Sequence, residues 1–522
     1  MQSPRSTTRA SSLRPLAVAG LPLVATVALA VPAPPTHPNV LFIAIDDLPN
    51  ELGCLGAPHA LTPRLDEFAA TARVFSNHYV QVPTCGASRC ALMTGLYPRR
   101  AAHIGNNAML ATHADYGART LPAWMRANGY QTLALGKITH YPGGLTGKDW
   151  AGGPEEMPGV WNRCWLPETP WKTPEAIMHG YANGQPRVPG KSAPLESFDG
   201  PDSAYPDWWI ASEAIATLRT LHASTPGAEA PNPKSKIENP KSQKPWFFAV
   251  GFFKPHLPFA APKRWFDLHA SQKIPPPIST TRPPEPSSWH NSGEFFGNYK
   301  DTKKRNPNRD PAYALELRRA HAASVSYVDA QVGRLLDELN KLGLDRDTIV
   351  IIWGDNGFLL GEHAIWGKHT LYENAVRTPL MIRVPGQPKP GARATATVET
   401  VDLFPTLADL CALPAPGGIN GRGLRPFIDN PETPSAKPAV SYWSAGQRSI
   451  RTDRWRLITH PSKAPVLADS VELFDMLNDP GETCNAASAN PEIVKELLAR
   501  LAVVPEIPAT NKTNAANAPS AE

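Results

Sequence analysis

The sequence has few cysteines and a small share of charged residues. Its 522 residues include six cysteines, at positions 54, 85, 90, 164, 411 and 484. They are too sparse for a disulfide scaffold, and no CxxC pair is present that would predict a zinc site. Charged residues make up 19% and hydrophobic residues 42% of the chain, which excludes a mostly disordered, collagen-like or coiled-coil protein.

The net charge gives no reason to expect a polyanionic partner. The chain carries 52 basic and 47 acidic residues, and Arg5, Arg9 and Arg14 lie in a leading segment without any acidic residue. The remainder is close to neutral. We therefore expect no binding of nucleic acid or of an acidic membrane, and any anionic ligand has to be bound by local groups.

The first 30 residues have the pattern of a secretory signal peptide. A basic stretch ends at Arg14, an apolar run follows from 15 to 30, and Ala28-Leu29-Ala30 is a small-x-small cleavage site. A membrane anchor is the less favoured alternative, because the run is shorter than the roughly 20 residues that cross a bilayer and contains Pro22. We expect export to the periplasm or the extracellular space after cleavage, with no transmembrane anchor.

Apolar runs that are typical of strands alternate with helical patterns from Asn39 onward. Because strands this apolar need cover on both faces, the pattern predicts an α/β fold with a central, mainly parallel sheet flanked by helices. Strands are predicted over residues 39–45, 131–136, 246–253 and 348–353, and helices over 62–75, 88–94, 121–130, 206–222 and 325–339.

Proline-rich and polar segments indicate how the chain is divided. The 58 prolines are about twice the usual number, which predicts long, irregular connections. We expect a catalytic domain over residues 36–430, with an insertion at 223–245 and a surface excursion at 274–311. A smaller C-terminal α+β subdomain is expected over 431–503, followed by a disordered tail at 504–522. The strand candidates of this C-terminal subdomain are 439–443, 448–451, 455–459 and 473–475, and its last helix is expected over 491–501.

Polar residues follow four of the predicted strands at their carboxyl ends, where parallel sheets bind ligands. Asp46, Asp47, Asp355 and Asn356 offer only oxygen ligands, which favours Ca²⁺, with Mg²⁺ as the alternative. Lysines and histidines at the same edge would repel a cation unless an anion lay between them, so a tetrahedral oxyanion is the expected ligand. These cationic candidates are Lys137, His140, Lys254 and His256.

The segment Cys85-Gly86-Ala87-Ser88-Arg89, followed by Thr94-Gly95, resembles the signature of the type I (formylglycine-dependent) sulfatases. In that family the pattern is C-x-[PA]-S-R and then TG, and a maturation enzyme oxidises the cysteine to formylglycine. Ala87 stands where most members have proline. Because maturation systems of the family differ in their tolerance of alanine there, this departure bears on which enzyme would convert Cys85. Cys85 also precedes a predicted helix, whose first N–H groups suit an anion.

Further motifs are most similar to the iduronate-2-sulfatase group. They cover most of residues 39–385, and their order along the chain makes the resemblance specific. Asn356 departs from that group, which has histidine there. The motifs are Asp46-Asp47-Leu48, Gly136-Lys137, Lys254-Pro255-His256-Leu257-Pro258-Phe259, Ser324-Val325-Ser326-Tyr327-Val328-Asp329, and Gly361-Glu362-His363 before Trp366-Gly367-Lys368.

The resemblance implies a fold similar to the alkaline phosphatase superfamily and a role for each matching residue. Asp46, Asp47, Asp355 and Asn356 would bind Ca²⁺ together with formylglycine made from Cys85. Arg89 and Lys137 would hold the formylglycine hydrate, and His140 would take its proton. His256 and Lys368 would contact the sulfate ester. The implied partners are a sulfated saccharide substrate and a formylglycine-generating maturation enzyme.

Two alternatives stay open at this point. The same site can accept a phosphoryl centre, so the nearest rival enzyme is a phosphodiester or phosphonate monoester hydrolase. The rival from another class is a non-catalytic protein that binds sulfated glycans. Lys254 is either on the substrate side or structural. An anionic substrate suggests specificity loops rich in cations, for which Arg163, Lys172 and Arg282 are candidates.

Overall fold

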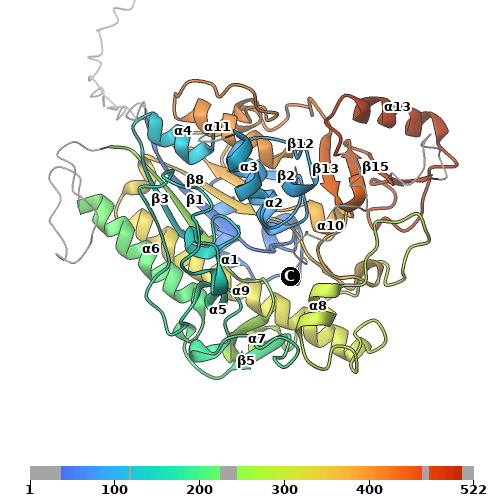
Figure 1. Cartoon of the computed structure of the whole chain (residues 1–522), viewed down its shortest axis with the longest axis horizontal. Coiled ribbons are helices and arrows are strands. Elements are labelled where there is room, and N and C mark those ends of the chain that lie inside the picture. The colour runs from blue at the N-terminus through green and yellow to red at the C-terminus, as the bar shows by residue number, and fades with distance from the viewer. Residues whose placement is uncertain (1–36, 117–118, 224–243, 461–469, 508–522) are drawn as a thin grey trace, which may run out of the picture. The chain divides into compact units, whose positions relative to one another are not determined.

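An eight-stranded sheet runs through the centre of the protein (Figure 1). The computed structural model describes residues 37–116, 119–223, 244–460 and 470–507. The predicted signal peptide, nearly all of the insertion at 223–245 and the tail from 508 lie outside these residues. The strands, in order across the sheet, are β12 (Arg393–Glu399), β2 (Arg73–Tyr79), β11 (Leu380–Arg383), β8 (Thr348–Gly354), β1 (Asn39–Ile45), β6 (Trp246–Phe252), β3 (Gln131–Gly136) and β4 (Arg163–Trp165).

The sheet is mainly parallel, as the sequence predicts. Only β11 runs antiparallel to its neighbours β2 and β8. At the centre, Ile45 at the end of β1 lies beside Phe252 of β6 and Gly354 of β8, and β3 pairs in parallel with β6. The carboxyl ends of these four strands therefore lie along one edge of the sheet.

Helices cover both faces of the sheet (Figure 1). The helices are α1 (Pro63–Ala69), α2 (Cys85–Thr94), α3 (Ala108–Tyr116), α4 (Leu121–Ala127), α5 (Pro174–Met178), α6 (Pro206–Ala223), α7 (Lys263–His269), α8 (Gly293–Asn298), α9 (Pro311–Lys341), α10 (Glu373–Val376), α11 (Leu403–Leu410), α12 (Arg425–Asp429) and α13 (Pro491–Ala502). Side chains of β1 alternate between two hydrophobic clusters. Val40, Phe42 and Ala44 pack with α2, α3, α4 and α11, whereas Leu41, Ile43 and Ile45 pack with α1, α6 and α9.

The predicted helix over residues 62–75 is wrong in its second half. Helix α1 ends at Ala69, and Arg73 begins strand β2. The reason is tertiary: the buried Arg73 guanidinium donates hydrogen bonds to the carbonyls of Pro388, Lys389, Ala392 and Ile428, more than 300 residues away. These partners hold residues 73–75 in the sheet although their local pattern favours a helix.

A second sheet of four antiparallel strands lies in the C-terminal part of the chain, where four strand candidates are predicted. Helix α13 follows it, and the described residues from 37 onward cluster as one compact unit. The domain boundary near residue 430 stays a prediction. No helix among the described residues has the length and hydrophobicity to cross a membrane. The strands are β13 (Ala439–Trp443), β14 (Gln447–Arg451), β15 (Trp455–Thr459) and β16 (Val471–Asp475), and short pairs elsewhere are β5 (Leu195–Phe198) with β7 (Phe259–Pro262) and β9 (Leu359–Leu360) with β10 (Trp366–Gly367).

A buried ionic network joins this second sheet to α10. Arg456 of β15 forms ion pairs with Glu373 of α10 and, at 2.8 Å, with Glu482, and its guanidinium donates a hydrogen bond to the Leu371 carbonyl at 3.1 Å. Burial alone would raise the pKa of Glu373, but Arg456 and Arg451 lower it to about 2. Glu373 is therefore charged at neutral pH, whereas burial raises the pKa of Glu482 to about 8 despite Arg456, so that this carboxyl is largely protonated. The members of the network depend on one another.

Removing Arg456 should strongly destabilise the protein. We expect Arg456→Met to lower the free energy of unfolding by about 3–5 kcal/mol, because the buried Glu373 carboxylate loses its nearest counter-charge. The matched control is Arg454→Ala, which removes an exposed ion pair with Asp475 in the same sheet and should leave the urea midpoint almost unchanged. Equal shifts of the midpoint in the two variants would contradict a special role for the buried network.

Candidate active site

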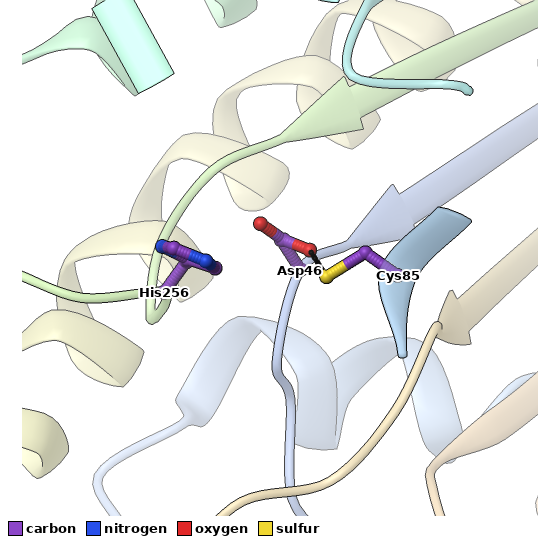
Figure 2. A group of neighbouring side chains, drawn as sticks. All are labelled: Asp46, Cys85 and His256. Atoms are coloured by element: carbon purple, nitrogen blue, oxygen red, sulfur yellow. Dashed lines mark hydrogen bonds between the residues drawn. The ribbon is translucent and has the colours of Figure 1, made fainter. Parts of the chain in front are cut away.

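The polar residues that follow four neighbouring strands meet at one edge of the sheet. Asp46 and Asp47 follow β1, Lys137 and His140 follow β3, His256 follows β6, and Asp355 and Asn356 follow β8. All seven side chains are buried. Figure 2 shows Asp46 between Cys85, at the start of α2, and His256. The structure thus brings together residues from 46 to 356 of the chain, as the sequence predicts.

Two glycines allow β3 and β6 to approach closely where Lys137 leaves the sheet. Gly136 has a left-handed backbone, with φ of 81°, and a Cβ there would lie 2.2 Å from the Gly251 carbonyl oxygen. A Cβ on Gly251 would lie 1.9 Å from the carbonyl oxygen of Lys137. The Lys137 N–H donates to the Gly251 carbonyl at 3.1 Å. The lysine side chain is therefore placed by backbone contacts that only glycine permits.

Cys85 lies at the centre of the site and is 2% exposed. Its Sγ is 3.3 Å from Asp46 Oδ1, and Lys368 Nζ lies 3.1 Å from the same sulfur. Burial, and then the charge of Asp46, raise the pKa of the thiol well above its usual value. The thiol therefore keeps its proton at neutral pH, and an unmodified Cys85 is a poor nucleophile.

Three cations pair with the three carboxylates. Lys137 Nζ lies 2.6 Å from Asp46 Oδ2, Lys368 Nζ lies 2.6 Å from Asp47 Oδ1, and Arg89 Nε lies 2.8 Å from Asp355 Oδ2. Burial alone would raise the pKa of Asp46, but the surrounding cations, Lys137 first, hold it well below its usual value. Burial works against the charge on Lys368, yet Asp47 raises the pKa of this lysine well above its usual range.

The ligand atoms present fit a hard divalent cation. One atom from each of Asp46, Asp47, Asp355 and Cys85 lies within 4.8 Å of all the others. Asp47 Oδ2 and Asn356 Oδ1 are buried and have no hydrogen-bond partner among the described residues. Burial, together with the charges of Asp46 and Asp355, raises the pKa of Asp47 to about 7 despite Lys368. A bound cation would relieve this repulsion and use the unpaired oxygens.

The two histidines of the site are held neutral. Burial, followed by Lys137, lowers the pKa of His140 well below its usual value, and burial followed by Lys368 does the same for His256. His256 Nδ1 lies 2.7 Å from the Leu257 carbonyl oxygen and must be the donor, since a carbonyl only accepts. In the neutral ring, Nε2 is then an acceptor, 3.9 Å from Asp47 Oδ2.

Lys254 is buried and contacts the backbone of its own segment. Its Nζ donates hydrogen bonds to the carbonyls of His256, at 3.2 Å, and Pro258, at 2.6 Å. The three candidate specificity cations make their contacts elsewhere or lie at the surface. Arg163 stacks on Trp165 and Arg282 on Trp289, and Lys172 is exposed. None of the three has a described contact with Cys85 or with its carboxylate neighbours.

Three residues near the site are missed by the sequence analysis. Trp150 and His179 belong to a row of rings between His140 and His256, with centroid distances of 5.5 to 5.7 Å. Trp150 has a left-handed backbone, with φ of 58°, which no sequence pattern indicates. The third is Glu294 of α8, 3.5 Å from His256 Nε2. It lies in the proline-rich excursion, where periodicity gives no signal.

Comparison with protein families gives two matches. The model of the family described as "Sulfatase" matches residues 38–412, a range that contains all the residues named in the site. The model described as "N-sulphoglucosamine sulphohydrolase, C-terminal" matches residues 361–506, which include the second sheet. Together the two models extend over nearly all the described residues.

Individual proteins agree with this assignment. The chain is 28% identical to iduronate 2-sulfatase of Homo sapiens over 424 residues, which are 72% of this chain and 70% of the relative. Its fold is similar to that of a protein solved with its substrate D-glucosamine-2-N,6-O-disulfate (TM-score 0.64, 22% identity, 89% and 97% of the two chains). It is also similar to that of a phosphonate monoester hydrolase of Agrobacterium radiobacter (TM-score 0.65, 20% identity, 89% and 96%). Because the family model covers well over half of the chain, this protein is a member of the sulfatase family.

Proposed function

We propose that this sulfatase hydrolyses a sulfate ester on a sulfated sugar, through a formylglycine hydrate made from Cys85 and with Ca²⁺ as the metal. The observation that carries the proposal is the single buried cluster in which Cys85 meets three carboxylates and three cations. Such a cluster suits a doubly charged cation and a tetrahedral anion at once. A thiol that keeps its proton supports the need for a modified residue at position 85.

Among sulfated sugars, we propose a 2-O-sulfated uronic acid as the substrate. The similarity to iduronate 2-sulfatase and the ordered motifs around Asp46, Lys137, His256 and Lys368 support this assignment. The structural neighbour solved with a disulfated glucosamine supports the broader class of sulfated saccharides. From the same resemblance we propose a formylglycine-generating maturation enzyme as a partner. From the signal-peptide pattern of residues 1–30 we propose export.

Cation binding falls to the residues at the ends of β1 and β8. Asp46, Asp47, Asp355 and Asn356 would hold Ca²⁺ together with the group at position 85. When bound, the cation would offset negative charge on the sulfuryl oxygens. Mg²⁺ is the less favoured alternative, because it demands a more regular octahedron of ligands than this mixed set offers.

The remaining residues position the nucleophile and move protons. A formylglycine hydrate at position 85 would supply one hydroxyl to attack sulfur and displace the sugar oxygen. Loss of a proton from its second hydroxyl would then re-form the aldehyde and release sulfate. Arg89 and Lys137 would hold the hydrate oxygens, and His140, held neutral by burial, would accept the proton on its ring. Lys368, which stays protonated, would donate a proton to the leaving oxygen with His256 beside it.

Mass analysis of the peptide that contains Cys85 tests the nucleophile. In protein purified from its native source we expect the mass of an aldehyde in place of the thiol. Cys85→Ala should lower kcat/KM for 4-nitrophenyl sulfate by about 10³-fold or more, while binding of the sulfated sugar is retained. Cys90→Ala, which removes a buried thiol of the same helix that contacts Thr112, is the matched control. An unmodified thiol with no hydrolysis by the native protein would favour a glycan-binding protein instead.

Removal of the metal should abolish activity and lower the melting temperature. We expect dialysis against EGTA to do both and Ca²⁺ to restore both, because a ligand that binds only the folded state stabilises it. Asp47→Asn should raise the Ca²⁺ concentration that produces half of the increase in melting temperature by about 10-fold or more. Asp409→Asn, which removes a surface carboxylate paired with Arg425, should not change it. If EGTA changes neither the melting temperature nor the activity, a role for a metal is ruled out.

The rival phosphonate monoester hydrolase is favoured by one observation, the fold similarity to such an enzyme. We expect the purified protein to hydrolyse 4-nitrophenyl sulfate with a higher kcat/KM than 4-nitrophenyl phenylphosphonate. The reason is that the family match over residues 38–412 is to sulfatases. The two kcat/KM values, measured on one preparation with saturating Ca²⁺, decide between the rivals, and faster turnover of the phosphonate would overturn the sulfatase proposal.

A further inference from the structure

Glu294 is a carboxylate beside His256, a residue proposed to contact the negatively charged sulfate ester. Its Oε1 lies 3.5 Å from Nε2 of His256, the histidine that one atom of Asp46 and one of Cys85 approach within 4.8 Å. Its side chain is 18% exposed, compared with 4% for His256 and 4% for Lys368. Glu294 is therefore the most accessible to solvent of these three side chains.

One oxygen of Glu294 has no partner. Oε2 is buried, and no described group donates a hydrogen bond to it. Burial alone would raise the pKa of this carboxyl, but Lys368, His369 and His179 lower it, so the group is ionised at neutral pH. Buried carboxylate oxygens are almost always hydrogen-bonded, because leaving one unpaired costs desolvation energy. The missing partner is expected to be a donor that arrives from outside.

The position of Glu294 restricts what that donor is. In the proposed function, His256 and Lys368 contact the ester at its leaving oxygen, so Glu294 lies next to the group that carries this oxygen. A sulfate or carboxylate would be repelled there. An ammonium group on the substrate would be repelled by Lys368 and by the Arg187 guanidinium, whose positive charges both lower the pKa of Glu294. A neutral hydroxyl remains, since it donates a hydrogen bond without adding charge.

We infer that Glu294 is a specificity-determining residue, which accepts a hydrogen bond from a substrate hydroxyl on the carbon next to the sulfated one. The inference rests on the proposed function and narrows the substrate class to sulfate esters with a free vicinal hydroxyl, as in a sugar ring. A site built to bind a hydroxyl rejects an analogue without it, because its buried acceptor is then left unpaired.

Two aryl sulfates that differ by this hydroxyl test the inference. 4-Nitrocatechol sulfate carries a hydroxyl next to its sulfate ester, and 4-nitrophenyl sulfate does not. The assay is run at a pH low enough that this hydroxyl, which the para nitro group makes acidic, keeps its proton and can donate a hydrogen bond. The measured quantity is the ratio of their kcat/KM values, which removes differences shared by both substrates. We expect Glu294→Ala to lower this ratio by about 10-fold or more. Glu294→Gln, which keeps an acceptor oxygen but no charge, should lower it less.

The matched control is Glu175→Gln. Glu175 is a carboxylate one contact farther out, paired with Arg187 and His179, and its removal should leave the ratio at the wild-type value. Loss of activity on both substrates to the same extent in the Glu294 variants would overturn the inference and assign Glu294 only to positioning His256. A drop of the ratio in Glu175→Gln as large as in Glu294→Gln would also overturn it. If the wild-type protein hydrolyses neither sulfate, the proposed function fails, and the inference fails with it.

Discussion

The rest of the site depends on three buried carboxylates being held within one small volume. Asp46, Asp47 and Asp355 repel one another in a region that excludes water, and the fold answers with Lys137, Lys368 and Arg89, each from a different element. No single loop supplies both signs of charge. The parallel sheet is what makes this possible, because its strand ends deliver residues from distant parts of the chain to one edge.

The same charge balance explains why the protonation states differ among neighbours. Lys368 and Arg89 keep their protons because carboxylates surround them, whereas His140 and His256 lose theirs because burial and the lysines disfavour a further positive charge. The site therefore offers fixed proton donors and fixed proton acceptors side by side. This separation is what acid and base steps on a single ester require.

Much of the site was predictable because it follows a rule about sheets. Apolar runs identify β1, β3, β6 and β8, and a polar residue follows each run within two positions, so the sequence alone places Asp46, Lys137 and Asp355. Cys85 and Lys368 do not follow such strands, and only the resemblance to a family indicated them. Strand β2 was missed in its first residues because the partners of Arg73 lie far along the chain. Glu294 was missed because a six-residue helix in a proline-rich segment has no periodicity to read.

The burial of Cys85 affects when, during synthesis and folding, another protein can reach its thiol. The sulfur is closed in by Asp46, which is synthesised before it, and by Lys368, which follows it by 283 residues. Until Lys368 has left the ribosome and packed against Asp47, the thiol lacks one of its covering groups. An enzyme that modified Cys85 would therefore reach the thiol more easily during synthesis, before folding is complete, than in the finished fold.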